Sequence, residues 1–169
     1  MEHCWREGFA ATSVADLTAG IGIKPPSLYA AFGSKEELFE EAAELYFDGV
    51  MSNVDRALGR STARDSLGEL LRISAEAYVD GATPPGCLLM SEPRLARQRQ
   101  VLSDRIAERL EKGIDDGDLP GSLDASDFAA FIVSVTVGMS RRARDGGTLE
   151  QLRSIAQVAL SAVPDLPRE

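Results

Sequence analysis

The sequence predicts an all-α protein of about nine helices, and three observations support this fold class. Apolar residues recur at spacings of three and four along most of the chain, as expected for helices that bury one face. Short breaks that contain Gly or Pro separate these segments, and several segments open on Ser, Thr or Asp, which cap helix N-termini. The alternation of polar and apolar residues that is typical of strands is absent.

Four helices are expected in the first part of the chain, at 1–8, 13–20, 26–32 and 34–58. The second and the fourth open on capping boxes, in which Ser13 precedes Asp16 and Ser34 precedes Glu37 by three residues. A glycine is expected to end each of the first three helices.

The third of these helices follows two adjacent prolines. Pro25 is expected to stay extended, because Pro26 disfavours helical backbone in the residue before it. Pro26 fits the first helical position, where no N–H is needed. The helix would be ~10 Å long, which suits a B-DNA major groove of about 12 Å. A short Gly-containing turn joins it to the preceding helix, so the pair is predicted to form a helix-turn-helix.

Five further apolar segments predict a larger helical body. Their expected ranges are 67–78, 87–90, 95–110, 124–139 and 148–160. Asp124 and Thr148 are expected to cap the last two helices. A domain boundary is expected near residue 48, inside the long fourth helix.

Composition and charge limit where the chain could bind nucleic acid and which compartment suits it. The chain has 169 residues and a net charge of −9, which argues against general nucleic-acid binding because phosphate contacts need cations. The charges of residues 1–35 balance, so a DNA contact is expected only in this neutral start. Two distant cysteines, Cys4 and Cys87, favour a reducing cytoplasm, as do the lack of a signal peptide and of a membrane-spanning stretch.

One segment carries a specific resemblance to a known family. Residues 8–42, GFAATSVADLTAGIGIKPPSLYAAFGSKEELFEEA, contain Gly, Thr-Ser, Gly-Ile, Ser-Leu-Tyr, Phe and Lys in order. This order resembles the DNA-binding domain of the TetR family of bacterial transcriptional regulators. The stretches GCLLM and GMSRRARDGGTLEQL resemble the family's C-terminal domain more loosely. The resemblance implies a helix-turn-helix DNA-binding domain at 1–48 and a helical ligand-binding and dimerisation domain at 49–169.

The resemblance further implies a homodimer that binds a palindromic double-stranded DNA operator, represses nearby genes and is released by a small-molecule effector, without a cofactor. The residues that match phosphate-contacting positions are Thr12, Ser13, Ser27, Tyr29 and Lys35. The residues that match groove-facing positions are Lys24, Pro25, Pro26 and Ser27. Because prolines carry no hydrogen-bonding side chain, base reading would depend on Lys24, on apolar contact with thymine methyl groups and on DNA shape.

The C-terminal body is expected to hold the effector and the dimer interface. The expected effector-lining residues are Leu71, Ser74, Tyr78, Cys87, Met90, Ile106, Phe131 and Val135. This lining is mostly apolar, which favours an apolar or weakly polar effector over an anion. The helix at 124–139 is apolar nearly all round, so a second copy is expected to cover its other face. The expected interface residues are Ala129, Val133, Val137, Leu152, Ala156, Ala159 and Leu160.

The short first helix and the few cysteines and histidines bear on the alternatives to a DNA-binding repressor. A dimeric ligand-binding module of the same fold, with impaired or lost DNA binding, is the main alternative, because residues 1–8 supply only the tail of a first helix. An enzyme is not expected, since a thiol peroxidase would need Cys-x-x-Cys or a cysteine with an available histidine. Cys87 is interpreted as a buried apolar filler rather than an oxidant sensor. No metal site is expected, because His3 is the only histidine.

Overall fold

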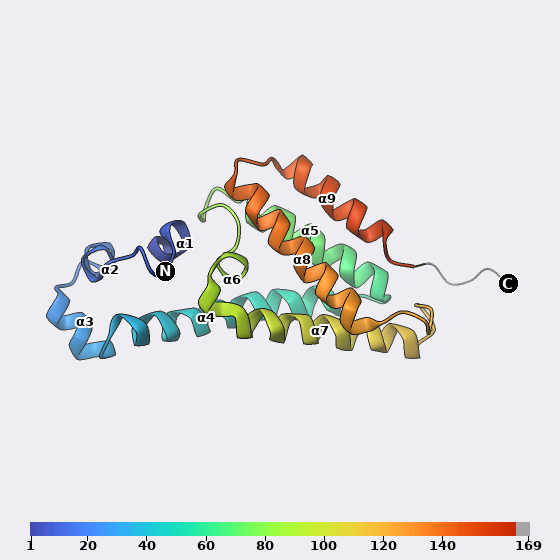
Figure 1. Ribbon diagram of the computed structural model, residues 1–169, viewed down its shortest axis with the longest axis horizontal. Coiled ribbons are helices and arrows are strands. Elements are labelled where there is room, and N and C mark those ends of the chain that lie inside the picture. Colours follow the sequence, from blue (N-terminus) through green and yellow to red (C-terminus); the bar gives the residue numbers. More distant parts are fainter. Residues whose placement is uncertain (165–169) are drawn as a thin grey trace. The chain divides into compact units, whose positions relative to one another are not determined.

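A computed structural model describes residues 1–164 of the chain, and these residues form nine α-helices and one 3-10 helix without a strand (Figure 1). The α-helices are α1 (Glu2–Glu7), α2 (Val14–Ile21), α3 (Pro25–Phe32), α4 (Lys35–Leu58), α5 (Ala63–Tyr78), α6 (Leu88–Ser91), α7 (Ala96–Asp115), α8 (Ala125–Arg144) and α9 (Leu149–Ser161). The 3-10 helix, η1 (Pro93–Leu95), leads into α7. The predicted all-α fold is therefore confirmed.

The chain divides into two compact units, with unit 1 at Met1–Val50 and unit 2 beginning at Met51. The helix α4 runs through this division. The assignment of DNA binding to 1–48 and of ligand binding and dimerisation to 49–169 stays a prediction.

The helix-turn-helix of unit 1 begins at a capping box. The Ser13 hydroxyl accepts a hydrogen bond from the Asp16 backbone N–H, and the Asp16 carboxylate accepts one from the Ser13 backbone N–H. Gly22 ends α2 in the left-handed conformation, with φ of 78°, and its N–H bonds back to the last turn. A side chain there would be strained, so Gly22 fixes the sharp turn between the two helices.

The start of α3 differs from the sequence prediction by one residue. The helix begins at Pro25, with both prolines in its first turn, and Lys24 is the N-cap. Neither proline needs an N–H there, so two prolines fit where one was expected. The extended conformation falls on Lys24, which has φ of −93° and ψ of 151° and itself precedes a proline.

Aromatic residues tie the start of the chain to α4 within unit 1. The rings of Phe9 and Phe39 lie 4.8 Å apart, and those of Trp5 and Tyr46 lie 5.4 Å apart. Leu28 of α3 is fully buried in the same unit. The two ring contacts join α1 and the segment after it to the first half of α4, and with buried side chains such as Leu28 they give this unit of about 50 residues a core.

Unit 2 is built around α8. This helix packs against α5, α6, α7 and α9, and Figure 1 shows it between α7 and α9. Its buried side is formed by Ala125, Ala129, Ile132, Thr136, Met139, Ser140 and Ala143. Within the described part of the chain, no helix is both long and apolar enough to cross a membrane.

Candidate nucleic-acid interface

Most of the predicted DNA-facing residues lie at the N-cap of α3 or within the helix. Lys24, Pro25, Pro26, Ser27 and Tyr29 are all exposed. The buried Leu28 fixes the opposite side of the helix to the core of unit 1. The short helix therefore presents its N-terminal turn to solvent.

Tyr29 is the largest exposed side chain of this surface. Its side chain is 50% exposed, so its hydroxyl can reach a ligand while the backbone carbonyl is held by Gly33 N–H. A tyrosine hydroxyl donates one hydrogen bond, which suits a phosphate oxygen.

Ser13 is exposed but already engaged. Its hydroxyl donates to the Asp16 carboxylate at 2.6 Å while it caps α2. The Ser13 hydroxyl and its backbone N–H keep the pKa of the Asp16 carboxyl below its usual range, so this carboxyl stays charged. A phosphate at Ser13 would meet that negative charge, which makes Ser13 a weaker phosphate contact than the resemblance implies.

The structure corrects the prediction for Thr12. Its side chain is buried, and both its backbone N–H and its hydroxyl donate to the Gly8 carbonyl oxygen, at 3.2 Å and 2.9 Å. The hydroxyl closes the connection between α1 and α2 instead of facing solvent. Thr12 is therefore a loop-closing residue, and its hydroxyl is not placed to touch phosphate.

Lys35 opens α4 and has a structural contact of its own. Its Nζ donates to the Phe9 carbonyl oxygen at 2.7 Å and lies 4.0 Å from the centroid of the Phe9 ring. An ammonium group has three donors, so it can hold Phe9 and still offer a proton to a phosphate. Sequence reasoning missed the contact with Phe9, because the two residues are 26 positions apart.

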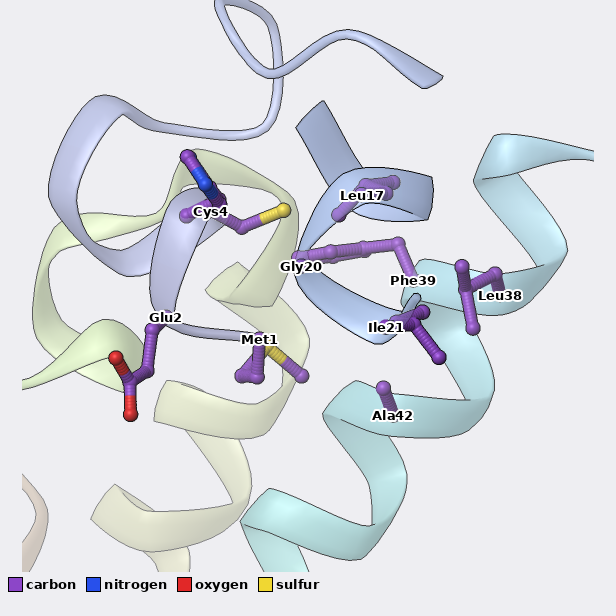
Figure 2. A pocket seen from close by; sticks show the side chains of 10 residues that line it. Met1, Glu2, Cys4, Leu17, Gly20, Ile21, Leu38, Phe39 and Ala42 are labelled. Atoms are coloured by element: carbon purple, nitrogen blue, oxygen red, sulfur yellow. The ribbon is translucent and has the colours of Figure 1, made fainter. Parts of the chain in front are cut away.

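Unit 1 also contains a cavity of about 430 Å³. Figure 2 shows Leu38, Phe39 and Ala42 of α4 across from Met1, Glu2 and Cys4. The other lining residues are His3, Leu17, Gly20 and Ile21. None of the predicted DNA-facing residues lines this cavity, so it is separate from the exposed side of α3.

The predicted effector-lining residues fall into three groups in unit 2. Five are buried, namely Leu71, Tyr78, Cys87, Met90 and Ile106. Ser74 and Val135 are half-buried. Phe131 is 39% exposed and contacts the Phe128 ring on the outer side of α8, which corrects its assignment to the inner lining. Among the residues that the structure describes, no group of three or more His, Cys, Asp or Glu could hold a metal ion.

The predicted dimer residues also need correction. The side chains of Ala129 and Leu152 are fully buried within the single chain, and those of Ala156 and Ala159 are nearly so, which leaves little area for a second copy. The buried side of α8 includes Ala129 and leaves Phe131 outside, the reverse of the prediction that placed Phe131 in the effector lining and Ala129 in the interface. Val133, Val137 and Leu160 are half-buried and keep part of their surface.

Sequence reasoning missed the most exposed apolar side chain of α9. Val158 is 69% exposed, although it lies between the buried Ala156 and Ala159 in sequence. No sequence signal marks this residue, because single exposed apolar side chains are common on protein surfaces.

The sequence is similar to bacterial transcriptional regulators. Residues 1–42 match the family described as bacterial regulatory proteins, tetR family. The transcriptional repressor BdcR of Escherichia coli is 31% identical over 183 residues, which cover 97% of this chain and 85% of BdcR. The repressor ComR of the same organism is 29% identical over 184 residues, covering 98% of this chain and 86% of ComR.

A solved structure extends the similarity to a DNA complex. A cysteine mutant of the TetR family transcriptional regulator CifR, complexed with 26-base-pair operator DNA, superposes on this chain with a TM-score of 0.93. The two chains are 34% identical, and the match covers 96% of this chain and 92% of the CifR chain.

Proposed function

The chain belongs to the TetR family of bacterial regulatory proteins, and from this premise we propose that it is a ligand-responsive transcriptional repressor that acts as a homodimer in the cytoplasm. Two copies would place two α3 helices in successive major grooves of a near-palindromic operator, about 34 Å apart. The observation that carries the proposal is the short α3, which begins with two prolines, ends at Gly33 and leaves Lys24, Pro25, Pro26, Ser27 and Tyr29 exposed.

Within this proposal the DNA contacts have two roles. Ser27, Tyr29 and Lys35 would bind phosphate oxygens and set the position of α3 on the duplex. Lys24 would reach a base edge, because it is the exposed N-cap of the helix that enters the groove. Ser13 would contribute less, since Asp16 already holds its hydroxyl.

The proposed effector site lies inside unit 2, among Leu71, Ser74, Tyr78, Cys87, Met90, Ile106 and Val135. The mostly apolar character of these side chains favours an apolar or weakly polar effector, since an unpaired buried charge would be costly. The last turns of α4 belong to unit 2 while its first turns carry the helix-turn-helix. An effector that moves those last turns would change the spacing of the two α3 helices and release the operator. The coupling must be reciprocal, so bound operator would lower effector affinity by the same factor.

The proposed dimer interface is the outer side of α8 and α9. It includes Phe131, Val133, Val137, Val158 and Leu160. Exposed and half-buried apolar side chains on two neighbouring helices are what a symmetric helical interface would cover.

A selection of bound duplexes from a random DNA pool tests the proposal. The expected result is a near-palindromic consensus whose affinity falls as salt rises. Lys24→Ala should change the consensus, with a loss of about 1–3 kcal/mol at one position. A protein that recovers no enriched sequence at low salt would contradict the repressor function and leave the ligand-binding module of the same fold.

A further inference from the structure

The polar groups that usually read bases are scarce in this helix-turn-helix. Residues 13–33 contain no Arg, Asn, Gln or His, and Lys24 is their only cation. Arginine reads guanine with two hydrogen bonds, and asparagine or glutamine reads adenine in the same way. Apart from Lys24, the polar side chains of this segment are short hydroxyls, Tyr29 and Asp16, and the Asp16 carboxylate already accepts from Ser13 at the start of α2.

The side of α3 that faces away from the core is apolar at its centre. Leu28 is fully buried and Phe32 is half-buried, and these two residues lie four positions apart on the core side. At about 3.6 residues per turn, the opposite side is formed by Pro26 and Ala30, which are also four positions apart. Both are exposed.

An exposed apolar centre has a specific counterpart in the major groove. Each base pair presents donors and acceptors there, but thymine alone also presents a methyl group, on its C5 atom. Hydrogen-bonding atoms of other base edges would lose water against Pro26 and Ala30 without gaining a partner. A thymine methyl group would instead gain apolar contact.

We infer that Pro26 and Ala30 determine operator specificity by contact with thymine C5-methyl groups at the centre of each half-site, an inference that rests on the proposed repressor function. The ligand class is therefore double-stranded DNA with thymine at the positions under the middle of α3. Lys24 reads the flanking base, and the phosphate contacts fix the register.

The test removes methyl groups without changing any hydrogen-bonding atom. The probe is the duplex recovered by selection from a random thymine-containing pool, resynthesised with deoxyuridine at single positions. Each replacement under α3 should weaken binding about fourfold, the value expected for one buried methyl group. Deoxyuridine in the spacer between the half-sites should change nothing. Replacement of the same thymine by 5-methylcytosine paired with guanine should retain more affinity than replacement by cytosine.

Protein variants assign the contact to its residue. In Pro26→Ala, the fourfold effect of deoxyuridine should shrink toward one at the position that Pro26 contacts, because the partner of the methyl group is gone. Lys35→Gln is the matched control, which should weaken thymine and uracil duplexes by the same factor. Equal affinity for thymine and uracil duplexes at every half-site position would overturn the inference while leaving the repressor function intact. Failure to bind any duplex would overturn both.

Discussion

The Nζ atom of Lys35 donates a hydrogen bond to the carbonyl oxygen of Phe9 and lies over the Phe9 ring, 4.0 Å from its centroid. The same ring packs on Phe39 of α4. One cation thus joins the connection that follows α1 to the start of the long helix. A residue that the family resemblance assigns to phosphate also holds unit 1 together.

Lys35→Gln is therefore expected to lower stability as well as DNA affinity. A hydrogen bond from a charged donor and a cation–π contact together predict a loss of about 2 kcal/mol from the free energy of unfolding. Urea denaturation of the full chain measures it. Lys24→Gln, at an exposed position, should change stability by less than about 0.5 kcal/mol. Equal stability of Lys35→Gln and the parent protein would show that the contact with Phe9 contributes nothing.

The outer side of α8 and α9 gives a test of dimerisation. Val158→Arg places a charge where the proposed interface would bury a side chain that is now 69% exposed. Burial of an unpaired charge is unfavourable, so the variant should have a monomeric mass by light scattering at micromolar concentration. Leu45→Arg is the control, because Leu45 is 72% exposed in unit 1. A dimeric mass for Val158→Arg would place the interface elsewhere.

Acid should weaken the ion pairs of α5, one of which, Glu76 with Arg153, joins α5 to α9. Hydrogen bonds from Arg72 and Arg60 lower the pKa of Glu69 to about 2, and Arg153 of α9 with Arg72 lowers the pKa of Glu76. A carboxyl whose pKa is depressed on folding stabilises the fold above its unfolded pKa and loses that contribution as pH falls.

The contribution of Glu69 should therefore be complete above about pH 5 and decline between about pH 4.5 and 2. Thermal unfolding midpoints of the parent and Glu69→Gln should differ at pH 6 and converge toward pH 2. Glu111→Gln, at an exposed position of α7, should follow the parent at every pH. A constant difference between Glu69→Gln and the parent from pH 6 to pH 2 would contradict the assignment.

Local signals made the helices predictable, whereas the site depends on tertiary contacts. The capping boxes at Ser13 and Thr148 act within four residues, so sequence alone located the starts of α2 and α9. The apolar pattern of α8 could not say which side faces the core, because nearly all of its sides are apolar. The packing of neighbouring helices determines which side of α8 faces the core. In this packing Ala129 faces inward and Phe131 faces outward.

Polar contacts were the least predictable part of the candidate site. The hydroxyl of Thr12 bonds to Gly8 because of how the connection between α1 and α2 folds, and no spacing rule specifies that. The hydrogen bonds of Arg109 in α7 were equally unpredictable, because their acceptors on Leu58 and Ser66 are far away in sequence.

The Arg109 guanidinium fixes the last turn of α4 within unit 2. Its side chain is 9% exposed, and its Nε donates to the Leu58 carbonyl oxygen at 3.1 Å and to the Ser66 hydroxyl at 3.0 Å. Its Nη2 approaches the Asp118 carboxylate at 3.8 Å, and Asp118 in turn accepts from the Ala63 backbone N–H. One buried cation therefore joins the ends of α4, α5 and α7.

Arg109→Met should destabilise the protein by about 3 kcal/mol, because the half-buried Asp118 carboxylate loses its charged neighbour and the Leu58 carbonyl and Ser66 hydroxyl lose a donor. Arg109→Lys should lose less, since it keeps the charge but not the forked donors. The control is Arg105→Met, one turn earlier on α7, where a half-exposed guanidinium pairs with Asp55 and should contribute about 0–1 kcal/mol. Urea denaturation at one fixed protein concentration compares the three variants. Equal losses in Arg105→Met and Arg109→Met would mean that burial of Arg109 adds nothing, and the proposed anchoring of α4 would be wrong.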